Sequence, residues 1–465
     1  MTDGLLSVDE ALARVLAATP NPGEPEIIWL REALGRVLAE PVESAIDLPP
    51  WDNSAMDGYA IRSADVLEAT DSAPVRLDVI GEVRAGQPPE TTVRRATAVR
   101  IATGAPLPAG ADAVVPVELT TPVDANGTAG ARGRDATGPV PTAILVHERV
   151  AQGGSIRRMA GDLRAGSRIL ETGSVLTPAA IALAAGAGLD RFSVHRRPIV
   201  GILATGDEVR SPGSALGPAG IPDANGPAIA AMVEEAGGDP RNLGIAADRF
   251  DDVRARLCAG LVEGADAIIV SGGVSVGPYD VVRAAFESFG SIDLWRVAVQ
   301  PGKPFAFGTG RLSGDANAGG TDAGGGADAG GETSRPPALL FGLPGNPVST
   351  FVTFELFVRP AIRRLAGRRD DDLFRARDRA VIGEAVSKGH GRRAFIRVTV
   401  ERDDRGTPVR DDHGRVRTHL AGGQAGQGSH VLSALAIADA LAVVPEADDA
   451  VPPGTELELW WLDRA

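Results

Sequence analysis

Two adjacent carboxylates stand just after an apolar run of strand length. The run Ile199–Leu203 leads into Thr205, Gly206, Asp207 and Glu208. In open α/β sheets, ligands bind outside the carboxyl ends of the strands. These four residues are therefore candidates for ligand binding and catalysis, although a solvated turn explains the Asp-Glu pair equally well when it is taken alone.

A second apolar run, Ala267–Val270, leads into a glycine-rich loop and then a helical pattern. The free backbone amides of such a loop, with the following helix N-terminus, can hold a phosphate or another oxyanion. The loop is not a Walker A motif, since no Gly-Lys-Ser/Thr follows, and it is not the G-x-G-x-x-G of dinucleotide folds. The candidate residues are Ser271, Gly272, Gly273, Ser275 and Gly277, with Asp280 just beyond them.

A third loop repeats this arrangement after the apolar run Ala338–Phe341. Prolines stiffen this loop, and its Asn and Ser side chains can cap the next helix or contact a ligand. Its candidate residues are Pro344, Gly345, Asn346 and Pro347. Lys303 adds a cation on a separate proline-flanked turn.

The acids on these loops predict a magnesium site, because hard oxygen ligands suit a hard cation that bridges phosphates. The expected ligands are Glu208, Asp248 and Asp280. Asp248 taken alone is also explained as an ordinary loop acid. Asp223 and Asn225, which precede Pro227, are typical of a helix N-cap. For Asn225 a ligand contact explains the residue equally well, and both interpretations stay open here. The six histidines have no spacing typical of metal ligands.

The elements that must position these loops follow from the pattern of apolar runs. Repeated strand, glycine loop and helix predict βα units on a parallel sheet from Pro198 onward. The other expected elements are a helix with a capping box at Ser7 and Glu10, a helix over Trp29–Leu38, a compact β unit over Tyr59–Val117, flexible tracts at Thr121–Pro141 and Gly314–Ser334, and a terminal β domain after Arg369.

Composition excludes several classes of protein. The chain has 465 residues, with 47 Lys and Arg against 61 Asp and Glu, so its net charge of -14 disfavours nucleic-acid binding. One cysteine, Cys258, excludes internal disulfides and Cys-based metal clusters. No signal-peptide pattern is present, and the longest apolar stretch falls short of the roughly 18 residues that span a bilayer. We therefore expect a cytoplasmic protein with no membrane segment.

Seven motifs in a fixed order resemble those of the molybdopterin molybdenumtransferase family, which includes the MoeA proteins and the related domain of gephyrin. The resemblance covers nearly the whole chain and fades in the two low-complexity tracts and the last domain. The motifs are PPWDNSAMDGYA (49–60), RIATGAPLPAGADAVV (100–115), IRRMAGD (156–162), ATGDE, SGGVSVG, PGKPFAFG and GLPGNPVSTF.

This resemblance implies a multidomain α/β plus β fold. The elongated N-terminal linking domain would comprise residues 1–48 and 148–182, with an inserted β domain at 49–147. A three-layer α/β molybdopterin-binding domain would follow at 183–370, and a C-terminal β barrel at 371–465.

The resemblance also implies an activity, a cofactor and a partner. In this family, adenylylated molybdopterin and molybdate are converted, with Mg²⁺, into molybdenum cofactor and AMP. The site would lie between the α/β domain of one subunit and the β domain of its partner in a homodimer. Asp57, Thr103 and Asp162 would then act from the second subunit, and Glu208, Asp248 and Asp280 would be catalytic or magnesium-binding acids.

Molybdate, a small dianion, requires cations and N–H donors. Many bacterial members have lysines where this chain has Arg296 and Gln300. The candidate molybdate residues are Arg296, Gln300, Lys303 and Ser275, with Arg392 and Ser429 carried over from the last domain. Surface turns explain Arg392 and Ser429 equally well.

Two other functions are alternatives to the transferase. A non-catalytic cofactor carrier or scaffold would keep the fold, but it would have no need of Asp57, Glu208, Asp248 and Asp280 together. A molybdopterin adenylyltransferase shares the α/β fold but lacks the β domain and the barrel. An adenylyltransferase and molybdoenzyme acceptors are candidate partners, besides a second copy of the chain.

Overall fold

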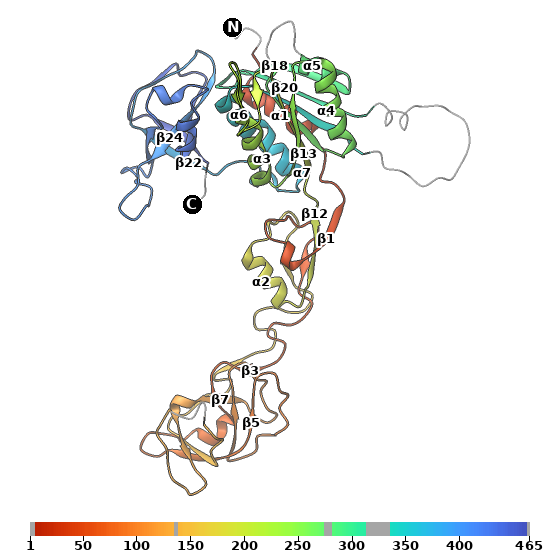
Figure 1. The fold of residues 1–465 in the computed structure, drawn as a ribbon. Coiled ribbons are helices and arrows are strands. Elements are labelled where there is room, and N and C mark those ends of the chain that lie inside the picture. The colour runs from red at the N-terminus through yellow and green to blue at the C-terminus, as the bar shows by residue number, and fades with distance from the viewer. Residues whose placement is uncertain (1–4, 134–137, 274–280, 313–334, 463–465) are drawn as a thin grey trace, which may run out of the picture.

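The protein is elongated, with a β-rich unit at one end and a larger α/β unit with a barrel at the other (Figure 1). The computed structural model describes residues 5–133, 138–273, 281–312 and 335–462. The predicted site residues Ser275, Gly277 and Asp280, and the whole tract Gly314–Ser334, lie outside these residues. Within the described residues, no helix has the length and apolarity needed to cross a bilayer.

The distal unit is a six-stranded β sheet in the order β7-β4-β6-β5-β9-β8. Its core includes Tyr59, Leu77 and Ile144, which are almost completely buried. The predicted flexibility of Thr121–Pro141 is wrong for its first part, because Thr121 to Val123 pair with β9. The strands are β4 (Gly58–Ile61), β5 (Val75–Val83), β6 (Thr97–Ile101), β7 (Ala113–Pro116), β8 (Thr120–Val123) and β9 (Ala143–Val146).

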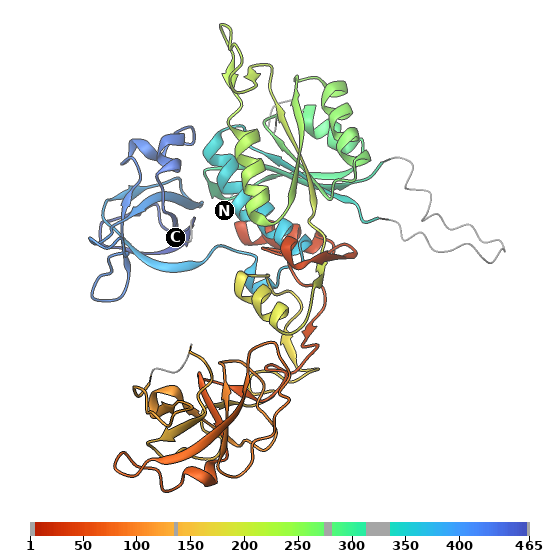
Figure 2. The ribbon, with the colours of Figure 1, turned by 60° about the horizontal axis from the view of Figure 1, so that its bottom comes forward.

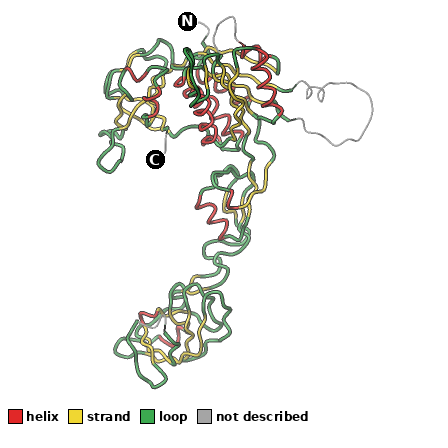
Figure 3. The backbone as a smooth tube through the Cα atoms, in the orientation of Figure 1, coloured by secondary structure: helices red, strands yellow, loops and turns green. Residues whose placement is uncertain are grey.

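Short antiparallel pairs join this unit to the rest of the chain, and strands and loops dominate there (Figure 3). The predicted helix over Trp29–Leu38 is wrong. Trp29 instead pairs with Arg191 of β12, about 160 residues away along the chain, and only a short 3-10 turn follows at Leu30–Glu32. The elements are β1 (Pro25–Trp29), β12 (Arg191–His195), β2 (Val42–Glu43), β11 (Arg168–Leu170), β3 (Asn53–Ser54), β10 (Ile156–Arg157) and α2 (Pro178–Gly186).

The α/β unit has a mixed sheet in the order β16-β13-β17-β21-β20-β18, with the first four strands parallel. Figure 2 shows helices on both faces of this sheet. The strands are β13 (Ile199–Thr205), β16 (Asp239–Ala246), β17 (Ala267–Ser271), β18 (Gly290–Arg296), β20 (Pro304–Gly310) and β21 (Ala338–Leu343). The helices are α3 (Asn225–Ala236), α4 (Phe250–Val262), α5 (Val281–Glu287), α6 (Pro347–Thr353) and α7 (Arg359–Leu365), and the short strands β14 (Val209–Arg210) and β15 (Ile221–Pro222) pair beside them.

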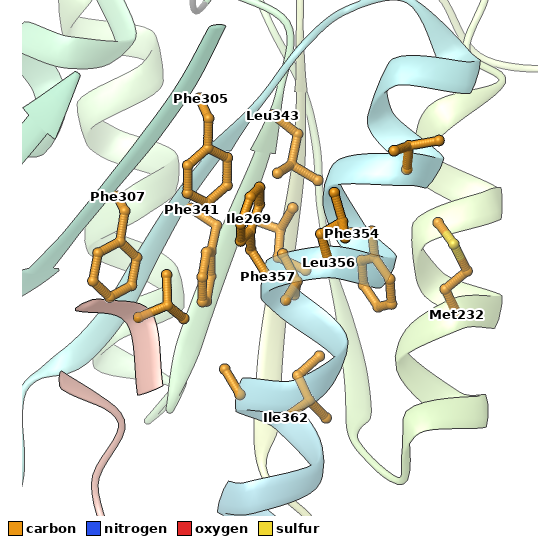
Figure 4. Close-up of a cluster of buried hydrophobic side chains, with 14 of the residues drawn as sticks. Met232, Ile269, Phe305, Phe307, Phe341, Leu343, Phe354, Leu356, Phe357 and Ile362 are labelled. Carbon is orange, nitrogen blue, oxygen red and sulfur yellow. The ribbon is translucent and has the colours of Figure 1, made fainter. Parts of the chain in front are cut away.

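Aromatic side chains fill the larger core on one face of this sheet (Figure 4). Phe305 of β20 and Phe357, which lies between α6 and α7, have ring centroids 4.6 Å apart. Burial of each such ring contributes about 1.5–3 kcal/mol. The helix α1 (Val8–Ala18) packs into the same core through Val8 and Val15. Its predicted capping box is present, since Ser7 Oγ accepts from Glu10 N and Glu10 Oε2 accepts from Ser7 N.

The C-terminal unit is a closed barrel. Strand β24 pairs with both β25 and β26, so that β24, β25, β22, β28 and β26 form a ring. The predicted strands Phe395–Val400 and Leu457–Trp460 are confirmed within it. The elements are β22 (Arg377–Ile382), β23 (Val386–Ser387), β24 (Arg393–Val400), β25 (Val416–Leu420), α8 (Leu432–Ala436), β26 (Ala440–Val444), β27 (Ala450–Val451) and β28 (Glu456–Trp461), while β19 (Val299–Gln300) joins β24 from the α/β unit.

The predicted domain boundaries stay predictions. The predicted linking domain includes residues 1–48, but α1, which lies within this range, packs into the core of the α/β unit. This placement follows from its amphipathic sequence, because the apolar face of α1 needs a larger apolar surface than the short linking strands offer.

Candidate functional site

The three predicted loops meet at one edge of the α/β sheet. Ser271 pairs with both Ala204 of β13 and Leu343 of β21, so these parallel strands end side by side. A cavity of about 570 Å³ lies at this edge. The predicted site residues that line it are Thr205, Gly206, Glu208, Asn225, Asp248, Ser271, Gly272, Gly273, Pro344, Gly345, Asn346 and Pro347.

Glycine is required where the second loop passes β13. Gly272 has a φ of +94°, and a Cβ there would lie 2.7 Å from the Thr205 carbonyl oxygen. Gly273 also has a positive φ, of +67°. A side chain at Gly272 would push the loop away from β13, so glycine permits the close approach that forms this wall of the cavity.

Acidic side chains gather at the mouth of this cavity. Glu208 and Asp248 line it, and Asp207 Oδ1 accepts a hydrogen bond of 3.3 Å from the Asp248 backbone N–H. The pKa of Asp248 is raised, first by burial and then by the negative charges of Asp207 and Glu208. None of these acids forms a salt bridge within the described residues, so a bound cation would relieve their repulsion.

One polar atom at the cavity is left without a partner. Thr205 is buried, and its Oγ1 has no hydrogen-bond partner among the described residues. A buried hydroxyl without a partner costs free energy, which a ligand atom can recover.

The start of α3 tests the N-cap interpretation of Asn225. Asp223 Oδ1, not Asn225, accepts the N-terminal hydrogen bond from Gly226 N, at 2.9 Å. Asn225 Nδ2 instead donates to Ser271 Oγ at 2.7 Å and to the Gly345 carbonyl at 2.8 Å. Its role as a helix N-cap is therefore wrong, and its side chain joins two of the three loops.

The barrel closes one side of the site. Asn346 Nδ2 donates to Ser429 Oγ at 3.1 Å, and Val348 N donates to the Ser429 carbonyl at 3.1 Å. His430, the next residue, lines the large cavity. The predicted residue Ser429 is thus connected to the Asn346 loop rather than lying on an isolated surface turn.

Ser429 also lines a second cavity of about 250 Å³, together with Gln300 and Arg397. Arg397 is only 1% exposed and has no carboxylate partner within the described chain. Its Nη2 donates to the carbonyls of Gly426 and Gly428, and burial lowers its pKa to about 10. An unpaired buried cation beside a polar cavity favours an anionic ligand.

Three other predicted molybdate residues lie outside both cavities. The Arg296 side chain is exposed, and Lys303 is half-buried. Arg392 is half-buried beside Gly389, whose N–H donates to Gln300 Oε1 at 2.8 Å. Of the predicted set, Gln300 and Ser429 are therefore the two described residues that line a common cavity.

The remaining predicted catalytic residues lie in or next to the distal β unit. Thr103 donates to Asp57 Oδ1 from its backbone N–H at 2.7 Å and from its Oγ1 at 2.8 Å, and these bonds hold the pKa of Asp57 below its usual range. Asp162 is exposed, and its N–H donates to the Leu48 carbonyl. In Figure 1 this unit lies at the opposite end of the molecule from the α/β unit, whose loops line the cavity, so one subunit does not bring the two groups together.

A complete metal site is not formed by the described residues. Among them, no three His, Cys, Asp or Glu side chains are grouped closely enough to hold a metal ion. The third predicted ligand, Asp280, lies outside them.

Three family models match in order: the MoeA N-terminal region (domain I and II) at residues 6–188, a probable molybdopterin binding domain at 201–364, and the MoeA C-terminal region (domain IV) at 379–462. Molybdopterin molybdenumtransferase 2 of Mycobacterium tuberculosis is 34% identical over 458 residues, covering 97% of this chain and 98% of the relative. The chain belongs to the MoeA family.

Other MoeA proteins are also similar to this chain over most of its length. Molybdopterin molybdenumtransferase of Haemophilus influenzae is 32% identical over 365 residues, covering 78% of this chain and 79% of the relative. The crystal structure of the molybdopterin biosynthesis MoeA protein of Pyrococcus horikosii has a TM-score of 0.73 at 28% identity, covering 99% and 100% of the two chains. The predicted family and its multidomain fold are confirmed.

Several residues of this MoeA site were missed from the sequence. Asp223 and Ser349 line the large cavity, and His430 reaches it from the barrel. The sequence could have indicated two of them as cavity residues, because Asp223 lies just before the candidate Asn225 and His430 lies beside the candidate Ser429. No feature of the sequence indicated that Arg397 is buried at a cavity, because an arginine in a strand usually faces solvent.

Asp52 is another missed residue, in the distal unit. Its carboxylate accepts from Met159 N and from Arg158 Nη1, both at 2.7 Å. It therefore joins the DNSAMDGYA segment to the IRRMAGD segment, which the sequence places about 100 residues apart.

Proposed function

We propose that this chain is a molybdopterin molybdenumtransferase that inserts molybdenum from molybdate into adenylylated molybdopterin and releases AMP. The observation that carries the proposal is the cavity at the ends of β13, β17 and β21, where glycine loops and carboxylates meet in a chain that matches curated transferases over nearly its full length. Release of AMP requires cleavage of a phosphoanhydride bond, so the site must bind and neutralise phosphate oxygens.

The loops supply binding groups for those phosphates. Gly273 and Gly345 line the cavity, and so does Asn225, at which α3 begins, so the backbone N–H groups of these residues are the candidate phosphate donors. Amides fixed in place stabilise developing negative charge without a covalent nucleophile. The Thr205 hydroxyl is a further donor, because its Oγ1 has no other partner in the described chain.

Magnesium fits the acids of this cavity. Glu208 and Asp248 would hold the ion, with Asp280 as a third ligand, and the ion would neutralise phosphate charge during cleavage. The fit rests on the position of Glu208 and Asp248, which both line the cavity and form no salt bridge among the described residues. The raised pKa of Asp248, caused first by burial and then by the charges of Asp207 and Glu208, agrees with it.

Molybdate would bind in the smaller cavity. Arg397 supplies an unpaired charge there, and Ser429 and Gln300 supply polar contacts. The Asn346–Ser429 hydrogen bond joins this cavity to the larger one. Arg392, Arg296, Lys303 and Ser275 would contribute only after a rearrangement or through residues outside the described ranges.

We further propose that the complete site needs two subunits. Asp57, Thr103 and Asp162 lie in or beside the distal β unit, far from the cavity of their own chain (Figure 1). A homodimer in which the β unit of one subunit faces the cavity of the other would use both groups. We place this dimer in the cytoplasm, as the single Cys258 indicates.

The test is anaerobic incubation of the pure protein with adenylylated molybdopterin, Mg²⁺ and molybdate. Molybdate-dependent release of AMP, lost in Asp280→Ala, is the expected result. Substrate binding without AMP release, with molybdate and with tungstate, would contradict the transferase and support a carrier. In a separate incubation with molybdopterin and ATP, consumption of ATP with release of pyrophosphate would instead support an adenylyltransferase.

A further inference from the structure

The Asn225 side chain forms a clamp between two of the ligand-binding loops. Its Nδ2 donates to Ser271 Oγ at 2.7 Å and to the Gly345 carbonyl oxygen at 2.8 Å. A carbonyl oxygen can only accept, so the amide nitrogen must be the atom that faces Gly345. Both hydrogens of the Asn225 amide are therefore used within the protein.

The clamped loops leave the sheet from neighbouring strands. Ser271 pairs with Leu343, and Gly272 N donates to the Leu343 carbonyl at 3.1 Å. Just beyond these bonds the strands end. Beyond the strand ends, the Asn225 side chain connects the two loops, and all three segments line the cavity.

The clamp is separate from helix capping. Asp223 already accepts from Gly226 N, so loss of the Asn225 side chain leaves that bond at the start of α3 in place. Asn225 also occupies the Gly345 carbonyl, an atom that would repel a phosphate oxygen. The residue thus fixes the spacing of the loops and engages an acceptor that opposes anion binding.

We propose that Asn225 is a positioning residue for the nucleotide-phosphate part of the substrate, acting through Ser271 and Gly345. The proposal rests on the proposed function, which requires a phosphoanhydride to be held between these loops. Displacement of binding groups by as little as 1 Å can cost about 100-fold in rate. We therefore expect a clear effect although Asn225 itself need not touch the substrate.

The test compares Asn225→Ala, Ser271→Ala and the double variant in the full-length protein. AMP binding is measured by calorimetry, and AMP release gives kcat and KM. Asn225→Ala should weaken AMP binding on the order of tenfold and lower kcat on the order of 10- to 100-fold. The double variant should be scarcely worse than the worse single variant, because residues that act as one unit are not additive.

Asn242→Ala is the matched control. Asn242 Oδ1 accepts from Gly244 N at 2.8 Å on β16, and Asn242 does not line the large cavity. This variant loses a local bond of similar length and should bind AMP as the wild type does. If Asn225→Ala does not fold, Asn225→Ser, which keeps one donor, should show a smaller loss of AMP binding.

Unchanged AMP binding and kcat in a folded Asn225→Ala protein would overturn the proposal. Effects that multiply fully in the double variant would also overturn it, because Asn225 would then act independently of Ser271. These results differ from a failure of the proposed function. In that case the wild type binds no AMP, or it binds AMP and releases none from the substrate.

Discussion

Asn346 and Ser429, 83 residues apart in the sequence, form a hydrogen bond of 3.1 Å between the α/β unit and the barrel. Asn346 lines the large cavity, and Ser429 lines the small one. The bond therefore lies between the proposed nucleotide and molybdate sites, and it makes the position of the barrel part of the geometry of both.

Ser429→Ala removes this side-chain bond but leaves the backbone bond from Val348 N to the Ser429 carbonyl. One hydrogen bond contributes about 1 kcal/mol, so we expect a loss of about fivefold in kcat/KM. Steady-state AMP release measures it. Ser214→Ala, which removes an exposed hydroxyl bonded to Ser211, should be neutral. Equal losses in both variants would contradict a specific role for Ser429.

Gln300→Lys changes affinity and stability in opposite directions. Lysine cannot accept from Gly389 N, so the free energy of unfolding should fall by about 1 kcal/mol. The added charge beside the small cavity should tighten molybdate binding by about tenfold. Calorimetry with molybdate and thermal unfolding measure the two effects. The control is Gln87→Lys on the exposed turn after β5, and tighter binding there as well would point to net charge alone.

Asp248 gives the site a dependence on pH and Mg²⁺. Its raised pKa means that the folded state binds the proton more tightly than the unfolded chain. The stability from protonation is present below the ordinary pKa of an aspartate and is lost as pH rises through the raised pKa. At pH 7 without Mg²⁺, Asp248→Asn should therefore unfold at a higher temperature than the wild type.

Mg²⁺ should reverse this order. The ion favours the ionised carboxylate, so it should raise the unfolding temperature of the wild type more than that of Asp248→Asn. Mg²⁺ affinity should fall as the pH is lowered toward the raised pKa, because the proton and the ion compete. Calorimetric titration with Mg²⁺ at several pH values measures this change in affinity. If Mg²⁺ raised the unfolding temperature of both proteins equally, Asp248 would be excluded as a ligand.

A shared site predicts complementation between two inactive variants. Asp57→Ala and Asp248→Ala alter groups at opposite ends of one chain (Figure 1). Co-expressed with different tags, they should form heterodimers in which one of the two sites is intact, so the doubly purified heterodimer should have about half of wild-type activity. Activity of the doubly purified heterodimer is the measurement. A site built within one subunit would leave the mixture inactive.

The sequence predicted the parts of the site that depend on local pattern. Glu208, Ser271 and Pro344 each follow a short apolar run, and each strand ends one or two residues beyond its run. Asp248 also reaches the cavity, from the loop after β16. Strands and the loops that follow them are set by nearby residues, so their place at one sheet edge follows from parallel pairing.

The parts that were missed depend on distant pairing. The sequence around Trp29 has helical spacing, but its pairing with β12 is fixed by residues about 160 positions away. Gln300 meets Gly389 because β19 joins β24 of the barrel. Arg397 faces inward from β24, whereas its charge would place it outward in a typical strand.

The distal β unit is joined to the chain at both ends, through the neighbouring pairs β2–β11 and β3–β10. A domain on a single linker can move through a wide volume. The distal β unit is instead held by two adjacent chain segments, which allow it to bend relative to the α/β unit more easily than to rotate about the connection. In the proposed dimer this restriction raises the effective concentration of Asp57 at the partner's cavity. Most of the conformational entropy that the distal β unit must lose to form the shared site is then lost during folding, before substrate binds.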